Sequence, residues 1–312
     1  MPHYRVQLQF LSPIGTPLLS DTLWGHLAWA IRYLDGEGAL DRWLQSQLQR
    51  PWVLSSAMPV GCLPTPLLKP VLRRDKGVGL RRLEELKKVK KARYIREEDF
   101  LALRDRMCQE NLQSQLVNHP GTSEALPPVA LRQARNRIDR RTSRTPESGG
   151  LYFLDDIVYS GGSEQAQFFV STSEPEEERL KRLLEFVGEN GFGRKSSVGR
   201  GAFNSRIEEE IALFSGGGNR LMNLSHGVLT ANMVTCRYRL HTHFGKLGAH
   251  LARGRFSPFK FPILMMAPGA TFTPRDRGPF GLALEGVHHE PALAGVRHHA
   301  LHLTIPFTET GP

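Results

Sequence analysis

The chain has 312 residues, of which 40% are hydrophobic, and a formal net charge of +10. This excludes a disordered chain, allows two domains of ordinary size, and favours a polyanionic partner, although charge alone does not separate nucleic acid from an anionic membrane. The sequence has no apolar run of the roughly 18 to 20 residues that span a membrane, and no signal-peptide core. Its cysteines are too scattered for a disulfide framework or a CxxC metal site, so we expect a cytoplasmic location: Cys62, Cys108 and Cys236.

The first predicted elements are a strand and an amphipathic helix. Hydrophobic residues alternate from Tyr4 to Phe10, which is typical of a strand, and a turn follows at Pro13 to Pro17. Ser20 or Asp21 is expected to cap the helix. The apolar face of the helix is predicted from residues at helical spacing: Leu23, Trp24, Leu27, Ala28, Ile31 and Leu34.

Most of the positive charge lies in two stretches of one long polar segment. Lys69 to Arg96 holds twelve basic against three acidic residues, and Arg132 to Arg144 holds six arginines against Asp139. We interpret the segment at about 61–150, which includes a helix predicted at 80–91, as an insertion into the first domain and not as core.

Two strands, a helix and a further strand follow the insertion. The strands are predicted at residues 151–159 and 165–171. Ser173 and Glu176 form a capping-box pattern before the helix, and a glycine at position 188 or 191 ends it. Without the insertion, the order is strand, helix, two strands, helix, strand, which is the pattern of a ferredoxin-like (RRM-like) unit.

We therefore predict an α+β protein with two ferredoxin-like domains. The first spans residues 1–212 and contains the insertion and a glycine-rich loop at 188–201. The second spans residues 220–312 and is β-rich, because strand-like runs occur at 227–243 and 259–272 and "RHHALHLTIPF" alternates near the end.

The segment "GENGFGRKSSVGRGAF", residues 188–203, packs five glycines around two serines and three basic residues. Glycine lets backbone N–H groups approach a ligand, and Arg194, Lys195 and Arg200 supply positive charge, so the loop suits phosphate. It is not a Walker A loop, because Arg194 stands where that motif needs lysine, and not a dinucleotide fingerprint, because Ser196 stands where glycine is needed. It also leaves a helix and enters a strand, the reverse of both nucleotide-binding contexts.

Three segments carry a resemblance to a known family. "TPLLSDTLWGHLAWAIR", "ARNRIDRRTSRTPESGGLYF" and the glycine-rich loop resemble the RAMP superfamily of CRISPR proteins, and within it the fourth subunit of the type III-A (Csm) effector complex, over about residues 1–210. The resemblance implies a non-catalytic subunit that binds the 5′ repeat-derived tag of crRNA in an antiviral complex. It also implies contacts with the large polymerase-like subunit and the repeating backbone subunit.

The resemblance and the residue chemistry together give expected RNA-binding residues. In the loop, those expected to hold tag phosphates are Gly193, Arg194, Lys195, Ser196, Ser197, Gly199 and Arg200. A basic hairpin in the middle segment would reach across the RNA with Arg135, Asn136, Arg137, Ile138, Arg140, Arg141 and Thr142. Ser20 and Asp21 are expected near the RNA path. The alternatives are a flexible surface turn for the loop and a solvated charged face for the arginines.

An enzymatic alternative arises because related RAMP ribonucleases that process precursor crRNA use a histidine as general acid or base. His26 is the one candidate, but no partner base is identifiable, and a lone helical histidine is more often structural. We therefore expect no catalytic residue and no cofactor. The alternative function is a metal-independent RAMP endoribonuclease that processes precursor crRNA, and a stand-alone RRM-like RNA binder is a third.

Two further features concern metals and partners. We expect no metal site, because adjacent histidines on extended segments point to opposite faces and no cysteine or acidic residue frames them. The histidines considered are His241, His243, His288, His289, His298, His299 and His302. "FSPFKFPILMMAP", residues 256–268, is the stretch in which we expect an exposed apolar patch for neighbouring subunits, with core burial as the alternative.

Overall fold

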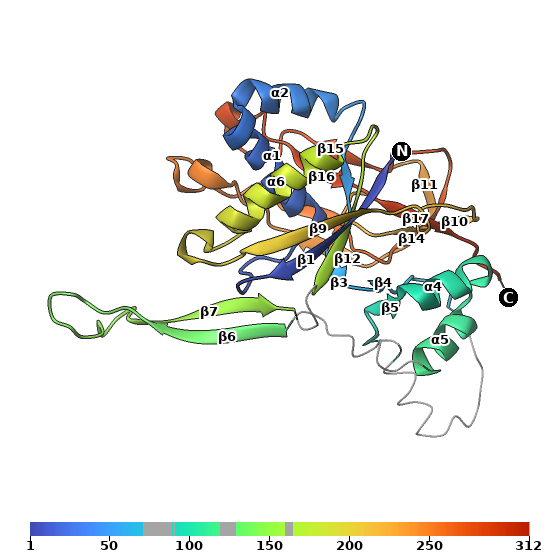
Figure 1. Ribbon diagram of the computed structural model, residues 1–312, viewed down its shortest axis with the longest axis horizontal. Helices are drawn as coiled ribbons and strands as arrows, with labels where there is room; N and C mark the ends of the chain where they lie inside the picture. The colour runs from blue at the N-terminus through green and yellow to red at the C-terminus, as the bar shows by residue number, and fades with distance from the viewer. Residues whose placement is uncertain (71–88, 90, 119–128, 160–164, 312) are drawn as a thin grey trace.

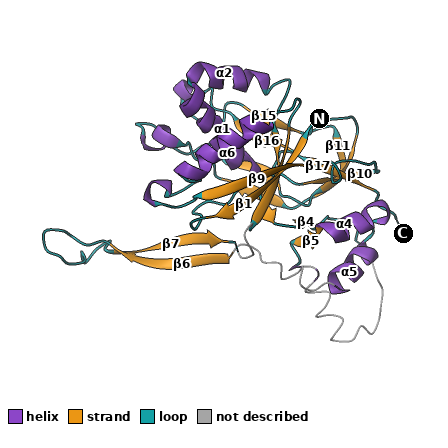
Figure 2. Cartoon of the chain, in the orientation of Figure 1, coloured by secondary structure: helices purple, strands orange, loops and turns teal. Residues whose placement is uncertain are grey.

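The computed structural model describes residues 1–70, 89, 91–118, 129–159 and 165–311. Figure 1 shows a body of antiparallel sheets with covering helices, from which a long hairpin projects to one side. Helices and strands both contribute substantially, as expected for a mixed protein (Figure 2). The helix expected at residues 80–91 lies almost wholly outside the described residues. In the described part of the chain, no helix is long and apolar enough to cross a membrane.

The first sheet contains five strands: β1 (His3–Phe10), β2 (Val53–Leu54), β3 (Met58–Pro59), β8 (Ala166–Ser171) and β9 (Phe203–Glu209). Its order is β2-β8-β1-β9, with β3 also paired to β8, and all pairs are antiparallel. The prediction that residues 151–159 form a strand of this unit is wrong, because those residues belong to the projecting hairpin. β2 and β3 take the place beside β8, and strands of two residues are too short to show an alternating pattern.

Two helices cover one face of the first sheet: α1 (Ser20–Asp35) and α6 (Glu177–Asn190). The alternate β1 side chains Tyr4, Val6 and Leu8 point to this face and share one core with the apolar stripes of both helices. α2 (Glu37–Ser46) follows α1 and adds the buried Trp43 to the same core. With the strand order above, this is a β-α-β-β-α-β arrangement.

The capping predictions at both helices are wrong. Ser20 lies inside α1, and its hydroxyl donates to the carbonyl oxygen of His226 at 3.2 Å. At the start of α6, no side chain caps the helix, and the N–H of Glu176 donates to the phenol oxygen of Tyr4 at 3.0 Å. Tertiary partners therefore take the place of local caps. Gly191 follows the last helical residue with φ of 80°, at one of the two predicted ends.

The second sheet consists of β10 (Arg220–Asn223), β11 (Met233–Arg237), β14 (Thr271–Pro274) and β17 (Thr304–Phe307). Its order is β11-β14-β10-β17, so both sheets have the order second, third, first, fourth along the chain. The connections in residues 220–307 carry hairpins and 3-10 turns in place of α-helices. The two hairpins are β12 (Leu240–His243) with β13 (Ile263–Met266), and β15 (Gly281–Leu284) with β16 (His298–Leu301). The C-terminal part is therefore β-rich, as predicted.

Part of the expected insertion belongs to the core beneath the second sheet. Its described elements are β4 (Cys62–Pro64), β5 (Tyr94–Arg96), α4 (Glu97–Leu103) and α5 (Gln109–Asn118). Phe100 on α4 is fully buried, with its ring centroid 6.5 Å from that of Phe307 on β17. The Arg104 guanidinium donates to the carbonyl oxygens of Pro306 and Leu213 at 3.0 and 2.8 Å. The expectation of a segment outside the core is thus corrected here, because short helices bury few residues each and leave the average composition polar.

β8 links the two cores because both of its faces are buried. All six residues from Ala166 to Ser171 are buried. Phe168 packs into the core below α1 and α6, whereas Phe169 packs into the core that contains Phe100. Burial on both faces explains why Phe168, Phe169 and Val170 follow one another without a polar residue between them.

Candidate nucleic-acid interface

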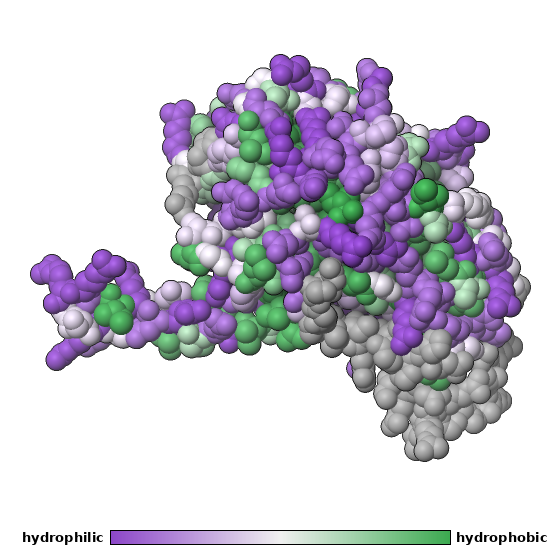
Figure 3. Space-filling view, viewed as in Figure 1, coloured by the Kyte–Doolittle hydropathy of each residue, from purple (hydrophilic) through white to green (hydrophobic). Residues whose placement is uncertain are grey.

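The projecting hairpin is formed by β6 (Val129–Asn136) and β7 (Leu151–Val158), which pair along their full length from Val129 with Val158 to Asn136 with Leu151. Most of its side chains on both faces are exposed. Figure 3 shows that its far end is mostly hydrophilic, whereas apolar side chains line one edge closer to the body. The hairpin is therefore held by its backbone ladder more than by a core, and most of its surface is open to a partner.

The tip of the hairpin, residues 137–150, is a compact turn organised by Asp139. The Asp139 carboxylate accepts from the N–H of Arg141 at 2.8 Å, and its carbonyl oxygen accepts from the N–H of Ser143 at 2.8 Å. The Asn136 amide donates to the hydroxyl of Thr145 at 2.7 Å. These bonds fix the backbone and leave side chains directed to solvent. All hairpin residues that the sequence predicted to bind RNA are exposed: Arg135, Asn136, Arg137, Ile138, Arg140, Arg141 and Thr142.

The glycine-rich loop is held against α1 and the turn that follows β1. The N–H of Gly193 donates to Nε2 of His26 at 3.2 Å, and the N–H of Arg194 donates to the hydroxyl of Thr16 at 2.9 Å. Gly201 has a φ of 78°, and a Cβ at this position would lie 2.1 Å from the carbonyl oxygen of Phe192. The loop therefore has a defined shape, which the alternative of a flexible surface turn does not predict.

Two arginines of the loop join it to the base of the hairpin. Arg200 is buried and forms an ion pair of 2.7 Å with Asp156 on β7, which is 1% exposed. The Arg194 guanidinium donates to the carbonyl oxygen of Asp155 at 2.7 Å. The loop therefore lies beside the base of the hairpin, while the tip with the other predicted RNA-binding residues projects away from the body (Figure 1). The expectation that Arg200 holds phosphate is corrected, because its charge is already neutralised in the interior.

Asp155 and Asp156 are the residues that the sequence analysis missed. They form an acidic pair on an otherwise apolar stretch of β7, and this was the signal available in the sequence. An acidic residue on a strand that becomes buried needs a cationic partner. Basic loop residues elsewhere in the chain were candidates for that partner.

The crest of the loop remains accessible. Lys195, Ser197, Val198 and Gly199 are exposed, and Ser196 is half-buried. Lys195 and Gly199 adopt positive φ values of 68° and 82°, and nothing lies within 4 Å of a Cβ built on Gly199. The N–H groups of Val198 and Gly199 donate to carbonyl oxygens within the loop. The charge of Lys195 and the hydroxyl of Ser197 remain open to an anionic ligand.

Ser20 and Asp21 are placed away from this surface. Both are buried at the start of α1. The Asp21 carboxylate lies 3.0 Å from Nε2 of His243, a residue of β12. Because both residues are buried, neither side chain is accessible to a ligand in this structure.

His26 supports the loop from α1. Its ring stacks against Phe192 with centroids 4.3 Å apart, while Nε2 accepts from the N–H of Gly193. Burial lowers the pKa of His26 from 6.5 to about 4. The imidazole is therefore neutral at pH 7, with Nε2 as acceptor, and it acts as an anchor for the glycine-rich loop.

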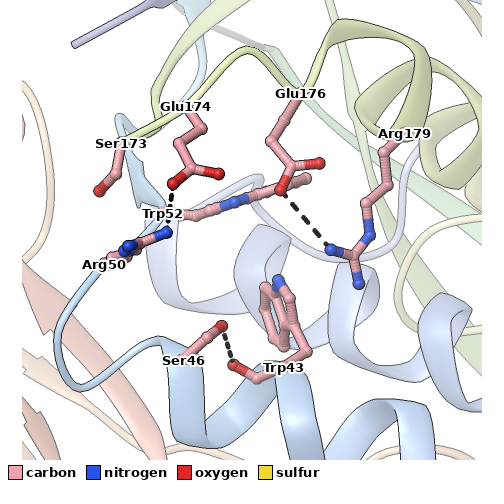
Figure 4. Close-up of a pocket in the computed structure, with 8 residues that line it drawn as sticks. All are labelled: Trp43, Ser46, Arg50, Trp52, Ser173, Glu174, Glu176 and Arg179. Atoms are coloured by element: carbon pink, nitrogen blue, oxygen red, sulfur yellow. Dashed lines mark hydrogen bonds and ion pairs between the residues drawn. The ribbon is translucent and has the colours of Figure 1, made fainter.

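A separate pocket lies between α2 and the segment before α6 (Figure 4). Its rim carries two ion pairs, Arg50 with Glu174 and Arg179 with Glu176. Trp43 and Trp52 form part of its wall. Because the rim charges balance each other, the pocket does not favour a polyanion, and we do not assign it to the interface.

The apolar stretch at residues 256–268 is divided between surface and core. Met265 and Met266 are buried, which fits the alternative of core burial. Phe259, Phe261 and Leu264 are 58%, 47% and 56% exposed. The exposed half of this stretch is a candidate surface for protein contacts.

Comparisons with known proteins agree with this architecture. A family model described as the RAMP superfamily matches residues 6–204. Among solved structures, a chain of the Csm1–Csm4 cassette in complex with pppApA matches with a TM-score of 0.61, 20% identity and full coverage of both chains. A chain of the Csm3–Csm4 subcomplex in the type III-A CRISPR-Cas interference complex matches with a TM-score of 0.57, 13% identity and full coverage of both chains. The search of curated proteins gives no match. The solved structures share this fold, and the family match shows that the chain belongs to the RAMP superfamily.

Proposed function

We propose that this chain is a non-catalytic subunit of a type III CRISPR RNA-guided effector complex that binds the 5′ repeat-derived tag of crRNA. The observation that carries the proposal is the junction of the glycine-rich loop with the hairpin base, through Arg200 with Asp156 and Arg194 with Asp155. This junction fixes the base of the basic hairpin beside the basic loop, two segments that are distant in the sequence. Two basic segments held in this way suit a single-stranded polyanion, because cationic side chains follow its backbone.

The two segments have different tasks in this proposal. The exposed arginines of the hairpin tip contact phosphates and stack on bases, and Ile138, which is 61% exposed, inserts between bases. The loop crest from Lys195 to Gly199 holds a phosphate through the charge of Lys195 and the hydroxyl of Ser197.

The proposal includes two protein partners, a large polymerase-like subunit and a repeating backbone subunit. Its support is the fold likeness to chains of the Csm1–Csm4 and Csm3–Csm4 assemblies. The exposed apolar side chains Phe259, Phe261 and Leu264 form one surface for such contacts. We also propose that residues 1–212 and 220–312 form two ferredoxin-like units, since their main sheets share one strand order.

Salt dependence tests the RNA-binding role. In Arg140→Ala with Arg141→Ala, the slope of log affinity against log salt for a tagged crRNA should flatten by up to about 1.4, since each phosphate contact on a single strand contributes roughly 0.7. The measurement is a fluorescence anisotropy titration at several salt concentrations. Thermal melting should be unchanged, because both side chains are exposed.

A charge-matched control separates a local contact from general attraction. Arg42→Ala with Lys181→Ala removes the same charge from exposed positions on α2 and α6. This control should keep the wild-type slope. Equal slopes for all three proteins, or equal flattening in both variants, would contradict the assignment of the hairpin tip.

Incubation with precursor RNA tests the endoribonuclease alternative. The isolated chain, without added metal, should not cut repeat RNA above background, because His26 is engaged with Gly193 and neutral. Cleavage that copurifies with the chain and disappears in His26→Ala would overturn the non-catalytic role. A pull-down that recovers neither crRNA nor companion proteins would contradict membership of a complex.

A further inference from the structure

A carboxylate and two imidazoles meet where α1 contacts the C-terminal hairpins. Asp21 comes from the first turn of α1, His243 from the end of β12 and His298 from the start of β16. One potential ligand atom of each residue lies within 4.8 Å of the others. Spacing along the chain pairs each histidine only with its neighbours, and the acidic partner Asp21 arrives from the other half of the molecule.

The distances fit a shared cation. Oδ2 of Asp21 lies 3.0 Å from Nε2 of His243 and 4.0 Å from Nε2 of His298. Zinc bonds of about 2.0 to 2.1 Å in a tetrahedron place neighbouring ligand atoms about 3.3 Å apart. Small side-chain movements therefore suffice to bring all three ligands to one ion.

Two buried polar atoms of this cluster have no hydrogen-bond partner in the described part of the chain. They are Oδ1 of Asp21 and Nε2 of His298, on side chains that are 4% and 2% exposed. Leaving such atoms unpaired is costly, and a metal ion would satisfy both. The side chain of His243 is 15% exposed, so the cluster has a route to solvent.

We propose that Asp21, His243 and His298 bind one zinc ion that cross-links α1 to the two C-terminal hairpins. Two imidazoles and a carboxylate are a common zinc ligand set, and a fourth ligand comes from Oδ1 of Asp21 or from water. The ion would be structural, because it ties together segments that are far apart in the sequence. It would stabilise the folded chain by binding to it in preference to the unfolded chain.

Lys260 is the competing source of positive charge. The negative charge of Asp21 favours the charged form of Lys260. The Lys260 ammonium donates to the carbonyl oxygen of Arg297 at 3.2 Å. If Lys260 and His243 alone balance Asp21, the chain needs no ion. The experiment has to distinguish these two arrangements.

The test uses the full chain, purified without a polyhistidine tag and stripped with a chelator. We expect zinc to raise the melting temperature, elemental analysis to give one zinc per chain, and magnesium to have no effect. Cobalt, used as a spectroscopic substitute, should give the visible absorption of a tetrahedral site. A melting temperature that is the same with and without zinc would overturn the proposal.

Variants then locate the ion. Asp21→Asn and His243→Ala should lose the zinc-dependent shift, whereas His289→Ala, which removes an exposed histidine, should keep it. If the first two variants do not fold, His243→Cys remains informative, because a thiolate bound to cobalt adds a charge-transfer band that only direct ligation produces. Zinc binding that survives in Asp21→Asn, or the absence of that band in a folded, cobalt-loaded His243→Cys, would refute this site.

Discussion

The glycine-rich loop and the hairpin tip are both basic, but the molecule holds them in different ways. In the loop, Arg194 and Arg200 are tied to Asp155 and Asp156, and the backbone is anchored on His26. At the hairpin tip, the arginines lie on the surface around a turn whose backbone hydrogen bonds are local. Charge in the loop therefore holds the loop against the hairpin base, whereas charge at the tip is exposed to solvent.

This difference shows that a positive residue within a motif is not by itself a binding residue. Arg200 and Arg140 have the same side chain and lie in the loop and at the hairpin tip. Arg200 is 9% exposed and paired, whereas Arg140 is exposed. The partner available in the fold decides which of the two can reach a phosphate.

The largest expected effect comes from breaking the buried pair. Arg200→Ala should lower the free energy of unfolding by about 3 to 5 kcal/mol, because it leaves Asp156 buried and uncompensated. Urea denaturation measures the loss. Arg206→Ala, which removes an exposed pair with Glu208, should cost no more than about 1 kcal/mol.

A double variant sharpens this test. Arg200→Met with Asp156→Leu removes both charges and should recover much of the stability lost in Arg200→Ala. Its hairpin base should also resist limited proteolysis like that of the wild type. Equal stability losses in Arg200→Ala and Arg206→Ala would show that the loop is not held in this way.

Acid should loosen the loop before it affects the tip. The pKa of His26 is lowered by burial from 6.5 to about 4, so the unfolded chain binds a proton between these pH values that the folded chain excludes. The contribution of His26 to the free energy of unfolding should therefore be fully present above pH 6.5. It should be lost as the pH drops to 4, which lowers the free energy of unfolding by up to about 3 kcal/mol.

His26→Gln is the matched variant, since the glutamine oxygen can accept from the N–H of Gly193 without taking up a proton. Denaturation at several pH values should show a smaller loss on acidification than in the wild type. His302, whose pKa burial also lowers to about 4, should contribute a loss in the same direction in both proteins. An identical pH dependence in wild type and His26→Gln would exclude His26 as the anchor.

The smallest expected effect concerns the loop crest. Gly199→Val places a β-branched residue at φ of 82°, which costs roughly 1 to 2 kcal/mol of backbone strain although the space around its Cβ is open. Affinity for tagged crRNA should fall while the salt slope stays the same, because no charge is lost. Gly199→Asn, which tolerates positive φ, should bind more nearly like the wild type.

The sequence was informative where the signal is a hydrophobic period, but the local capping patterns failed because tertiary partners replace the caps. The spacing of hydrophobic residues and the local composition predicted β1, α1, β8 and α6. The run of arginines at the hairpin tip was predicted to be exposed. Spacing and composition did not predict that Asp21 would meet His243, or that Arg200 would meet Asp156, because those partners are set by how distant segments pack. The second strand of the first sheet was misassigned for a related reason, since β2 and β3 gain their order by pairing with β8 and not from their own pattern.

The contact between Phe100 on α4 and Phe307 on β17 has a consequence for biosynthesis. All strands of the first sheet are available once β9 has emerged from the ribosome. The apolar face of α4 lacks its partner Phe307 until β17, the last strand, has been made. Contacts between segments so distant in the chain form late and slowly. The apolar face of α4 therefore lacks one of its core partners through most of synthesis, and a stop codon shortly before β17 should yield an aggregating product even though the first sheet is complete.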